Sequence, residues 1–100
     1  MKVEISPTAI VSLEEIIVYL RKRWTKKEID TLKKDIQDFI KIMNQETITH
    51  QSLENFPQIR FALIAKRQVK LFYEVRENKA LIKLFWHCKQ NPKKLTDLLK

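Results

Sequence analysis

The chain has 100 residues, with 20 Lys and Arg against 12 Asp and Glu, which gives a formal net charge of +8. This length fits one domain spanning residues 1–100 and excludes a separate substrate-binding domain. Glycine is absent, which excludes the Gly-rich phosphate cradles of common nucleotide-driven enzymes, because those loops need close backbone approach. The single cysteine, Cys88, excludes an intrachain disulfide and a cysteine-based zinc site.

The basic residues are unevenly distributed along the chain. Residues 1–50 hold nine basic and eight acidic residues, whereas residues 51–100 hold eleven basic and four acidic residues. A strongly basic half favours an anionic partner, which can be nucleic acid, an acidic protein segment or a membrane surface. A solvated basic surface with no specific partner is an alternative of about equal weight at this point.

No segment predicts a membrane span or a signal peptide. The longest apolar runs, Ile16–Leu20 and Phe61–Ala65, have five residues each. A membrane span needs ~20 residues and the apolar region of a signal peptide needs ~7–15. We therefore expect a soluble, cytoplasmic protein that does not bind membranes.

The first half predicts a strand followed by two helices. Lys2–Ile5 alternates polar and apolar residues, as a half-buried strand does. Ser6 then caps a helix whose first residue is Pro7, a position where the missing N–H of proline costs nothing. The apolar stripe of this helix recurs every three or four residues, at Ile10, Leu13, Ile17, Leu20 and Trp24.

The second helix follows with almost no linker. Thr25 and Glu28 form a capping box at its start, and its apolar stripe consists of Ile29, Leu32, Ile36, Phe39, Ile40 and Met43. The two helices form an αα-hairpin, and a sheet is the natural cover for both stripes. The same periodicity places four carboxylates on outer, solvated helix faces: Glu14, Glu15, Asp35 and Asp38.

The second half predicts a polar loop, three strands and a short helix. The loop runs from Asn44 to Pro57, the strands are Ile59–Lys66, Val69–Val75 and Ala80–His87, and the connections between strands are short enough for hairpins. Alternation in the last strand predicts one face with Leu81, Lys83, Phe85 and His87, and the other with Ile82, Leu84, Trp86 and Cys88. Asn91 and Pro92 then begin a helix over residues 93–100.

The order of these elements predicts an α+β fold. An N-terminal strand and three later strands form a four-stranded, mainly antiparallel sheet, and the αα-hairpin packs on one face of that sheet.

The residues that suit chemistry on an anionic substrate lie in the second half. The imidazole of His87 titrates near neutral pH and can act as a general acid or base. Lys66, Arg67 and Lys89 can hold a phosphodiester and stabilise charge that develops at phosphorus. These four residues would suit RNA cleavage without a metal. A second group contains candidates for binding a target or a partner: Arg60, Lys70, Tyr73, Lys83, Gln90 and Asn91.

Structural interpretations compete with these roles. His87 can equally be a strand-end residue bonded to backbone, and Phe72 and Trp86 are more often core residues than platforms for nucleic-acid bases. His50 has no second histidine or carboxylate at ligand spacing, so we interpret it as a surface residue. No metal site and no cofactor is predicted.

The motifs and their order resemble the RelE/ParE superfamily of type II toxin–antitoxin toxins, and are closer to its ParE-like members. The segments that carry this resemblance span nearly the whole chain: Ile5–Ala9, Leu13–Ile16, Tyr19–Leu20, Trp24, Ile59–Arg60, Val69–Val75, Ile82–His87 and Lys89–Leu95. The resemblance implies a small basic toxin that an acidic, partly disordered antitoxin neutralises in a hetero-oligomer. It also implies that DNA is contacted only through the antitoxin.

The resemblance implies two alternative activities. ParE-like members inhibit DNA gyrase, whereas RelE-like members cut mRNA on the ribosome with basic residues and a polar aromatic residue or histidine near the C-terminus. His87 matches the position of that histidine, but no tyrosine follows Tyr73 and glycines of many members are missing. The long helical hairpin favours gyrase inhibition. Ribosome-dependent mRNA cleavage and a non-catalytic homologue that binds an antitoxin or nucleic acid are the alternatives.

Overall fold

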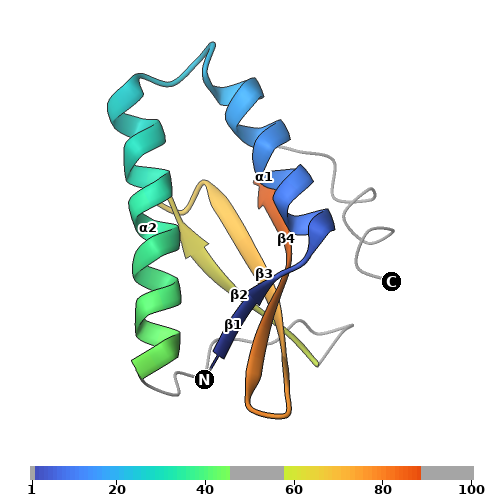
Figure 1. Ribbon diagram of the computed structural model, residues 1–100. Helices are drawn as coiled ribbons and strands as arrows, with labels where there is room; N and C mark the ends of the chain where they lie inside the picture. The colour runs from blue at the N-terminus through green and yellow to red at the C-terminus, as the bar shows by residue number, and fades with distance from the viewer. Residues whose placement is uncertain (1, 46–57, 89–100) are drawn as a thin grey trace.

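The computed structural model describes residues 2–45 and 58–88, and it confirms the predicted α+β class (Figure 1). The elements follow the order β1 (Lys2–Ile5), α1 (Pro7–Leu20), α2 (Lys26–Gln45), β2 (Ile59–Ile64), β3 (Val69–Arg76) and β4 (Lys79–His87). The helix predicted over residues 93–100 and most of the predicted loop, residues 46–57, lie outside the described residues, as does His50. Neither described helix has the length and apolar character that crossing a bilayer requires.

The four strands form one sheet with the order β1-β4-β3-β2. The pair of β1 and β4 is parallel, and the pairs of β4 with β3 and of β3 with β2 are antiparallel. Glu77 and Asn78 join β3 to β4 with φ angles of 48° and 67°. Two positive φ angles in a two-residue connection are those of a type I′ turn, which matches the twist of a hairpin.

Both predicted helix starts are confirmed. The Ser6 side chain accepts a hydrogen bond from the Ala9 N–H at 3.1 Å, and Pro7 is the first helical residue of α1. At the start of α2 the Thr25 N–H donates to Glu28 Oε1 at 3.3 Å and the Glu28 N–H donates to Thr25 Oγ1 at 3.4 Å. Each cap satisfies N–H groups that the first helical turn leaves without a partner.

The main core lies between the two helices and one face of the sheet. The α2 stripe is buried as predicted, with Ile40 half-buried beside it. The α1 stripe is partly wrong: Leu20 is buried, but Ile10 is 47% exposed and Ala9 and Ile16 take the inward positions. Apolar residues surround most of α1, so the stripe alone does not determine its orientation.

A second apolar cluster lies on the opposite face of the sheet. It contains Ile59, Phe72, Leu84 and Trp86, with Phe61 packed against them. Phe72 and Trp86 are therefore core residues, as their structural interpretation predicted.

The predicted faces of the last strand are correct for Leu84, Phe85 and Trp86 but wrong for Ile82, because β4 contains a β-bulge. Phe72 pairs with Leu84, but the next residue, Tyr73, pairs with Ile82, so Lys83 is an extra residue in β4. One extra residue reverses the alternation that follows it. Phe85 consequently shares the helix-facing side with Ile82, whereas Leu84 and Trp86 lie on the opposite side.

Two serines attach α1 to the edge of β4 where β1 ends. The backbone N–H of Ser6 donates to the Ile82 carbonyl at 3.0 Å, and its hydroxyl donates to the Lys83 carbonyl at 3.3 Å. One turn later the Ser12 hydroxyl accepts from the Phe85 N–H at 3.0 Å and donates to the Ala9 carbonyl at 2.8 Å. The serines thus satisfy backbone groups of β4 that lie beyond the end of its pairing with β1.

We predict that Ser12→Ala lowers the free energy of unfolding by about 1–3 kcal/mol, because the buried Phe85 N–H loses its acceptor. Urea denaturation measures this loss. Thr8→Ala, on the exposed side of α1, is the matched control and leaves stability unchanged or slightly raised. Equal stability of wild type and Ser12→Ala would show that this hydrogen bond does not hold α1 to the sheet.

Candidate functional site

His87 ends β4 on the helix-facing side of the sheet and is only 4% exposed. Its ring centroid lies 6.1 Å from that of Tyr19 and 6.3 Å from that of Trp24. The imidazole therefore packs beneath the C-terminal end of α1. A substrate would have to displace Tyr19 or Trp24 to reach it.

Lys66 and Arg67 are exposed in the turn Ala65–Gln68, which joins β2 to β3. The predicted strand was too long by two residues, because β2 ends at Ile64. Ala65, Lys66 and Arg67 have φ angles of 52°, 55° and 68°. The left-handed conformation costs roughly 1–2 kcal/mol for each residue that carries a Cβ, so this turn stores backbone strain.

Three hydrogen bonds hold the strained turn in place. Asp35 Oδ2, on α2, accepts from the Ala65 N–H at 2.8 Å. The Gln68 N–H donates to the Ala65 carbonyl at 3.1 Å, and the Cys88 N–H donates to the Gln68 carbonyl at 2.9 Å. The prediction that Asp35 lies on a solvated face is therefore wrong, whereas Glu14, Glu15 and Asp38 are exposed as predicted.

Two hollows flank Trp24 at the end of the molecule where α1 meets α2. A cleft of about 250 Å³ separates the strained turn from the start of α2 and is lined by Trp24, Thr25, Lys27, Glu28, Thr31, Ala65, Lys66 and Gln68. A second hollow of about 440 Å³ is lined by Arg21, Trp24, Lys26, Ile29, Asp30 and Lys33. Each hollow combines apolar surface from Trp24 with lysine or arginine side chains at its edge.

The sheet holds three of the predicted binding residues in different settings. Lys70 is half-buried on β3, with its Nζ 5.4 Å from the centroid of the Phe61 ring. Arg60 is half-buried on β2 and pairs with Tyr73 in the strand register. Tyr73 has no exposed surface and makes an edge contact with Phe39 at 5.3 Å. Tyr73 is therefore a core residue.

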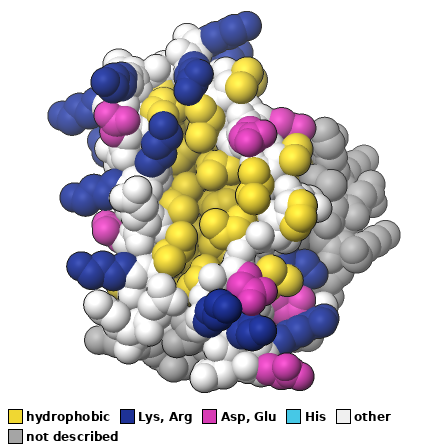
Figure 2. Space-filling view, viewed as in Figure 1, with side chains coloured by type: hydrophobic (Ala, Val, Ile, Leu, Met, Phe, Trp, Pro, Cys, Tyr) yellow, Lys and Arg dark blue, Asp and Glu magenta, His cyan; other side chains and the backbone are white. Residues whose placement is uncertain are grey.

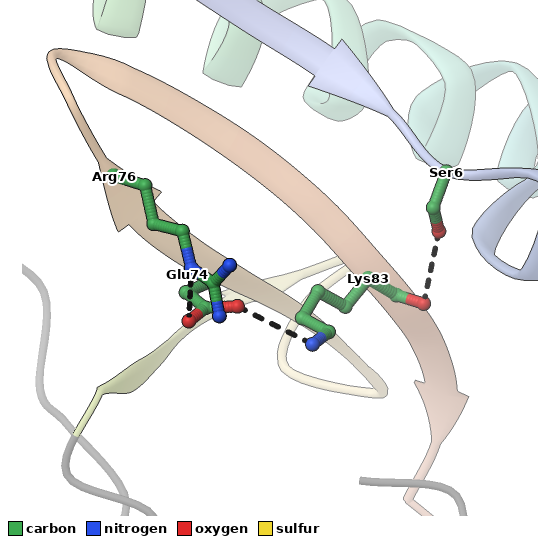
Figure 3. Close-up of polar contacts among 4 residues, drawn as sticks. All are labelled: Ser6, Glu74, Arg76 and Lys83. Carbon is green, nitrogen blue, oxygen red and sulfur yellow. Dashed lines mark hydrogen bonds and ion pairs between the residues drawn. The ribbon is translucent and has the colours of Figure 1, made fainter.

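Lys83 belongs to an ion-pair cluster around the buried Glu74 on the sheet (Figure 3). Glu74, at 5% exposed, accepts from Arg76 Nε at 2.8 Å and from Lys83 Nζ at 3.3 Å. Figure 3 also shows that the Lys83 carbonyl turns the other way, toward the Ser6 hydroxyl. The cation that was predicted to bind a partner thus neutralises a carboxylate of the chain itself.

The pKa of the Glu74 carboxyl is lower than its ordinary value of 4.5. Burial alone would raise this pKa, because desolvation disfavours the charged form. Hydrogen bonds from Arg76 and Lys83, together with their positive charges, outweigh the effect of burial. Glu74 is consequently ionised at neutral pH and holds the two cations.

Three of the four predicted catalytic residues, Lys66, Arg67 and His87, lie within the described residues. Lys66 and Arg67 lie beside the end of β4, because Gln68 bonds to Cys88 there. The His87 ring is nevertheless buried on the helix-facing side. Lys70 packs on Phe61, a ring of the opposite face. The remaining candidates, Lys89, Gln90 and Asn91, lie outside the described residues.

The sequence analysis did not predict the structural roles of two carboxylates. Asp35 bonds to a residue 30 positions away and Glu74 bonds to one nine positions away. Helical periodicity and strand alternation describe neighbours along one element, so neither pattern identifies such pairs. Within residues 2–45 and 58–88, no group of three His, Cys, Asp or Glu side chains is arranged to hold a metal ion.

The fold is similar to that of a solved toxin. The crystal structure of a copper-bound mutant toxin from Helicobacter pylori matches with a TM-score of 0.57 and 10% sequence identity, over 88% of this chain and 94% of that chain. At this identity the likeness establishes a shared fold alone. No family model and no curated protein matches the sequence.

We predict that Arg67→Gly raises the free energy of unfolding by up to about 1 kcal/mol, because glycine adopts the left-handed conformation without a Cβ clash. Chemical denaturation measures the gain. Lys27→Gly, in the first turn of α2, is the matched control and lowers stability by up to about 1 kcal/mol. A loss in both variants would mean that the turn at Arg67 is unstrained.

We predict that Glu74→Gln lowers the free energy of unfolding by about 1–3 kcal/mol at pH 7, because Gln lacks the negative charge and one of the two acceptor oxygens that bond to Arg76 and Lys83. The folded-state pKa is lowered, so this stabilisation is complete above the ordinary pKa and disappears as pH falls through the folded-state pKa. Chemical denaturation of wild type and Glu74→Gln at a series of pH values from 7 downward should give free energies of unfolding that converge in acid. Glu77→Gln, in the exposed turn, is the control. A difference in stability between wild type and Glu74→Gln that does not change with pH would contradict the lowered pKa of Glu74.

Proposed function

We propose that this chain is the toxin component of a type II toxin–antitoxin system in the RelE/ParE family. We further propose that it is ParE-like and inhibits DNA gyrase by binding it. The order of the sequence motifs supports this proposal along nearly the whole chain. The fold supports it as well, because the solved structure with the same arrangement is also a toxin.

One observation favours binding over RNA cleavage. The only histidine of the predicted nuclease group, His87, is 4% exposed beneath Tyr19 and Trp24. A general acid or base must come within hydrogen-bond distance of the substrate atom that it protonates or deprotonates. Lys70 and Lys83 contact groups of the protein itself, Phe61 and Glu74 respectively. The described residues therefore supply a cationic binding surface more readily than a set of converging catalytic groups.

The proposed partner is an acidic antitoxin that forms a hetero-oligomer with this chain in the cytoplasm. Figure 2 shows a strip of hydrophobic side chains between α1 and α2, with Lys and Arg side chains along the border formed by α2. The hollow at one end of the molecule has the same character, because Arg21, Lys26 and Lys33 surround Trp24 and Ile29. Acidic segments with apolar anchors complement such a surface in both charge and burial. In this proposal DNA is contacted through the antitoxin.

Ribosome-dependent mRNA cleavage is the second candidate, and the strained turn favours it. Residues held in rarely populated backbone conformations cluster at functional sites, and this turn presents Lys66 and Arg67 to solvent. These cations suit the RNA backbone whether or not His87 takes part in chemistry.

Inducible expression in a bacterial host tests the proposal, with growth, mRNA 5′ ends and DNA-damage signalling recorded in one culture. Purified protein is tested in parallel against gyrase in a supercoiling assay. We expect growth arrest, intact messages and loss of supercoiling. New cuts inside translated messages would establish the nuclease instead. Normal growth in the absence of any antitoxin would favour the non-catalytic homologue.

We predict that His87→Phe retains toxicity, because phenylalanine preserves an aromatic contact with Tyr19 and Trp24 while it removes the titratable group. A nuclease that uses His87 as an acid or base would instead lose about 100-fold or more in rate. The thermal midpoint of the variant shows that it remains folded. Loss of toxicity in a folded His87→Phe would contradict the binding mechanism.

A further inference from the structure

The outer face of α1 carries apolar side chains that no described element covers. Val11 is 53% exposed, Val18 is 63% exposed and Tyr19 is 48% exposed. The side of α1 that faces the sheet is formed instead by residues such as Ile16 and Leu20. Val11 and Val18 are seven residues apart and therefore lie almost one above the other on the helix. Such a face on a helix marks a contact with another element or molecule.

Charged residues of opposite sign follow one another along this face of the helix. Glu14 and Glu15 lie between the two valines, and Lys22 and Arg23 follow Tyr19. Both charge pairs and the three apolar residues line one hollow of about 710 Å³. The Arg23 guanidinium lies 4.1 Å above the Tyr19 ring centroid.

The backbone beyond α1 keeps these two cations in line with the helix. The Arg21 N–H donates to the Ile17 carbonyl at 2.9 Å, and Trp24 donates to the Leu20 carbonyl at 2.6 Å. Each is a bond to the residue four positions earlier, as in an α-helix. The positions of Lys22 and Arg23 relative to Glu14 and Glu15 can therefore be treated as those of one continuous helix.

We propose that this face of α1 binds a second copy of the chain, with the two helices antiparallel about a two-fold axis between Val18 and Tyr19. An antiparallel pair about this axis brings Glu15 of one copy opposite Lys22 of the other. It also packs each Val18 on the Tyr19 of the other copy. A two-fold axis repeats every contact, so the dimer contains this ion pair twice.

Charge complementarity selects a second copy over other occupants. An acidic segment laid along this face would meet Glu14 and Glu15, and a basic segment would meet Lys22 and Arg23. A second copy in the antiparallel orientation places its cations where the first copy has its carboxylates, and its carboxylates where the first copy has its cations. One helix face per partner is a small interface, so we expect a weak dimer that forms as protein concentration rises. The proposal does not depend on the proposed toxin function.

Sedimentation equilibrium of the purified full chain at low salt tests the dimer by charge reversal. In Glu15→Lys the mutated residue opposes Lys22 of the other copy, and in Lys22→Glu it opposes Glu15. Either single variant creates two repulsive contacts per dimer, so we expect the dissociation constant to rise about ten-fold or more. The double variant reverses both partners, restores two attractive pairs and should dimerise about as well as wild type.

Apolar variants provide a matched test of the same face. Val18→Ser removes a side chain at the two-fold axis and should weaken the dimer. Ile10→Ser changes an exposed residue of the same helix, 47% exposed and outside the hollow, and should leave dimerisation unchanged. Circular dichroism of each variant verifies that α1 still forms.

Three results would overturn the proposal. The first is a wild-type chain that stays monomeric up to roughly millimolar concentration, the weakest range of specific binding. The second is a dimer that survives Glu15→Lys, or a double variant that associates no better than the singles. The third is a monomeric chain in which Val18→Ser abolishes antitoxin binding, since that would assign the face to the antitoxin. Each result concerns association and leaves the gyrase and mRNA experiments unaffected.

Discussion

The attachment of α1 to the edge of β4 is the interaction on which the arrangement of this protein depends. β1 pairs with only four residues of β4, from Lys79 to Ile82. Beyond that point no strand of the described residues lies beside this edge of β4. Ser6 and Ser12 supply a donor and an acceptor there, from a helix rather than from a strand. A helix is thereby fixed to a sheet edge by side-chain hydrogen bonds, and the buried edge avoids an unsatisfied N–H group.

This attachment coincides with the β-bulge that determines what the site can do. The extra residue, Lys83, lies between the two serine contacts, and its side chain turns toward Glu74 on the face away from Ser6. After the bulge, β4 places Phe85 in the main core and His87 beneath Tyr19 and Trp24. The imidazole that nuclease chemistry would need is therefore buried, whereas Lys66 and Arg67 are exposed.

Local patterns in the sequence predicted the elements well. The caps at Ser6 and Thr25 and the α2 stripe each depend on residues that are close along the chain, and the structure confirms them. The orientation of α1 was harder to predict, because apolar residues occupy its outer face as well as its inner face. Alternation in β4 failed at one residue, Lys83, since a bulge leaves no local sequence signal.

The candidate site was less predictable for two physical reasons. Contacts such as Asp35 with Ala65 and Glu74 with Lys83 join distant positions, so they arise only once the fold has formed. The strained turn was not predicted either. Glycine is the usual sequence signal for a positive φ angle, and this chain has none. The absence of glycine excluded Gly-rich phosphate-binding loops as a sequence pattern, but it also concealed a left-handed turn that carries Lys66 and Arg67.

Native-state hydrogen exchange at the Phe85 amide tests the attachment of α1 most directly. This N–H has the Ser12 hydroxyl as its acceptor and belongs to a residue that is 1% exposed. If α1 is held on the edge of β4, we expect the amide to exchange only through global unfolding, as slowly as the central amides of β3. Fast exchange at Phe85 while β3 stays protected would show that α1 detaches from the sheet. His87 would then not stay buried, and the observation that favours binding over RNA cleavage would be lost.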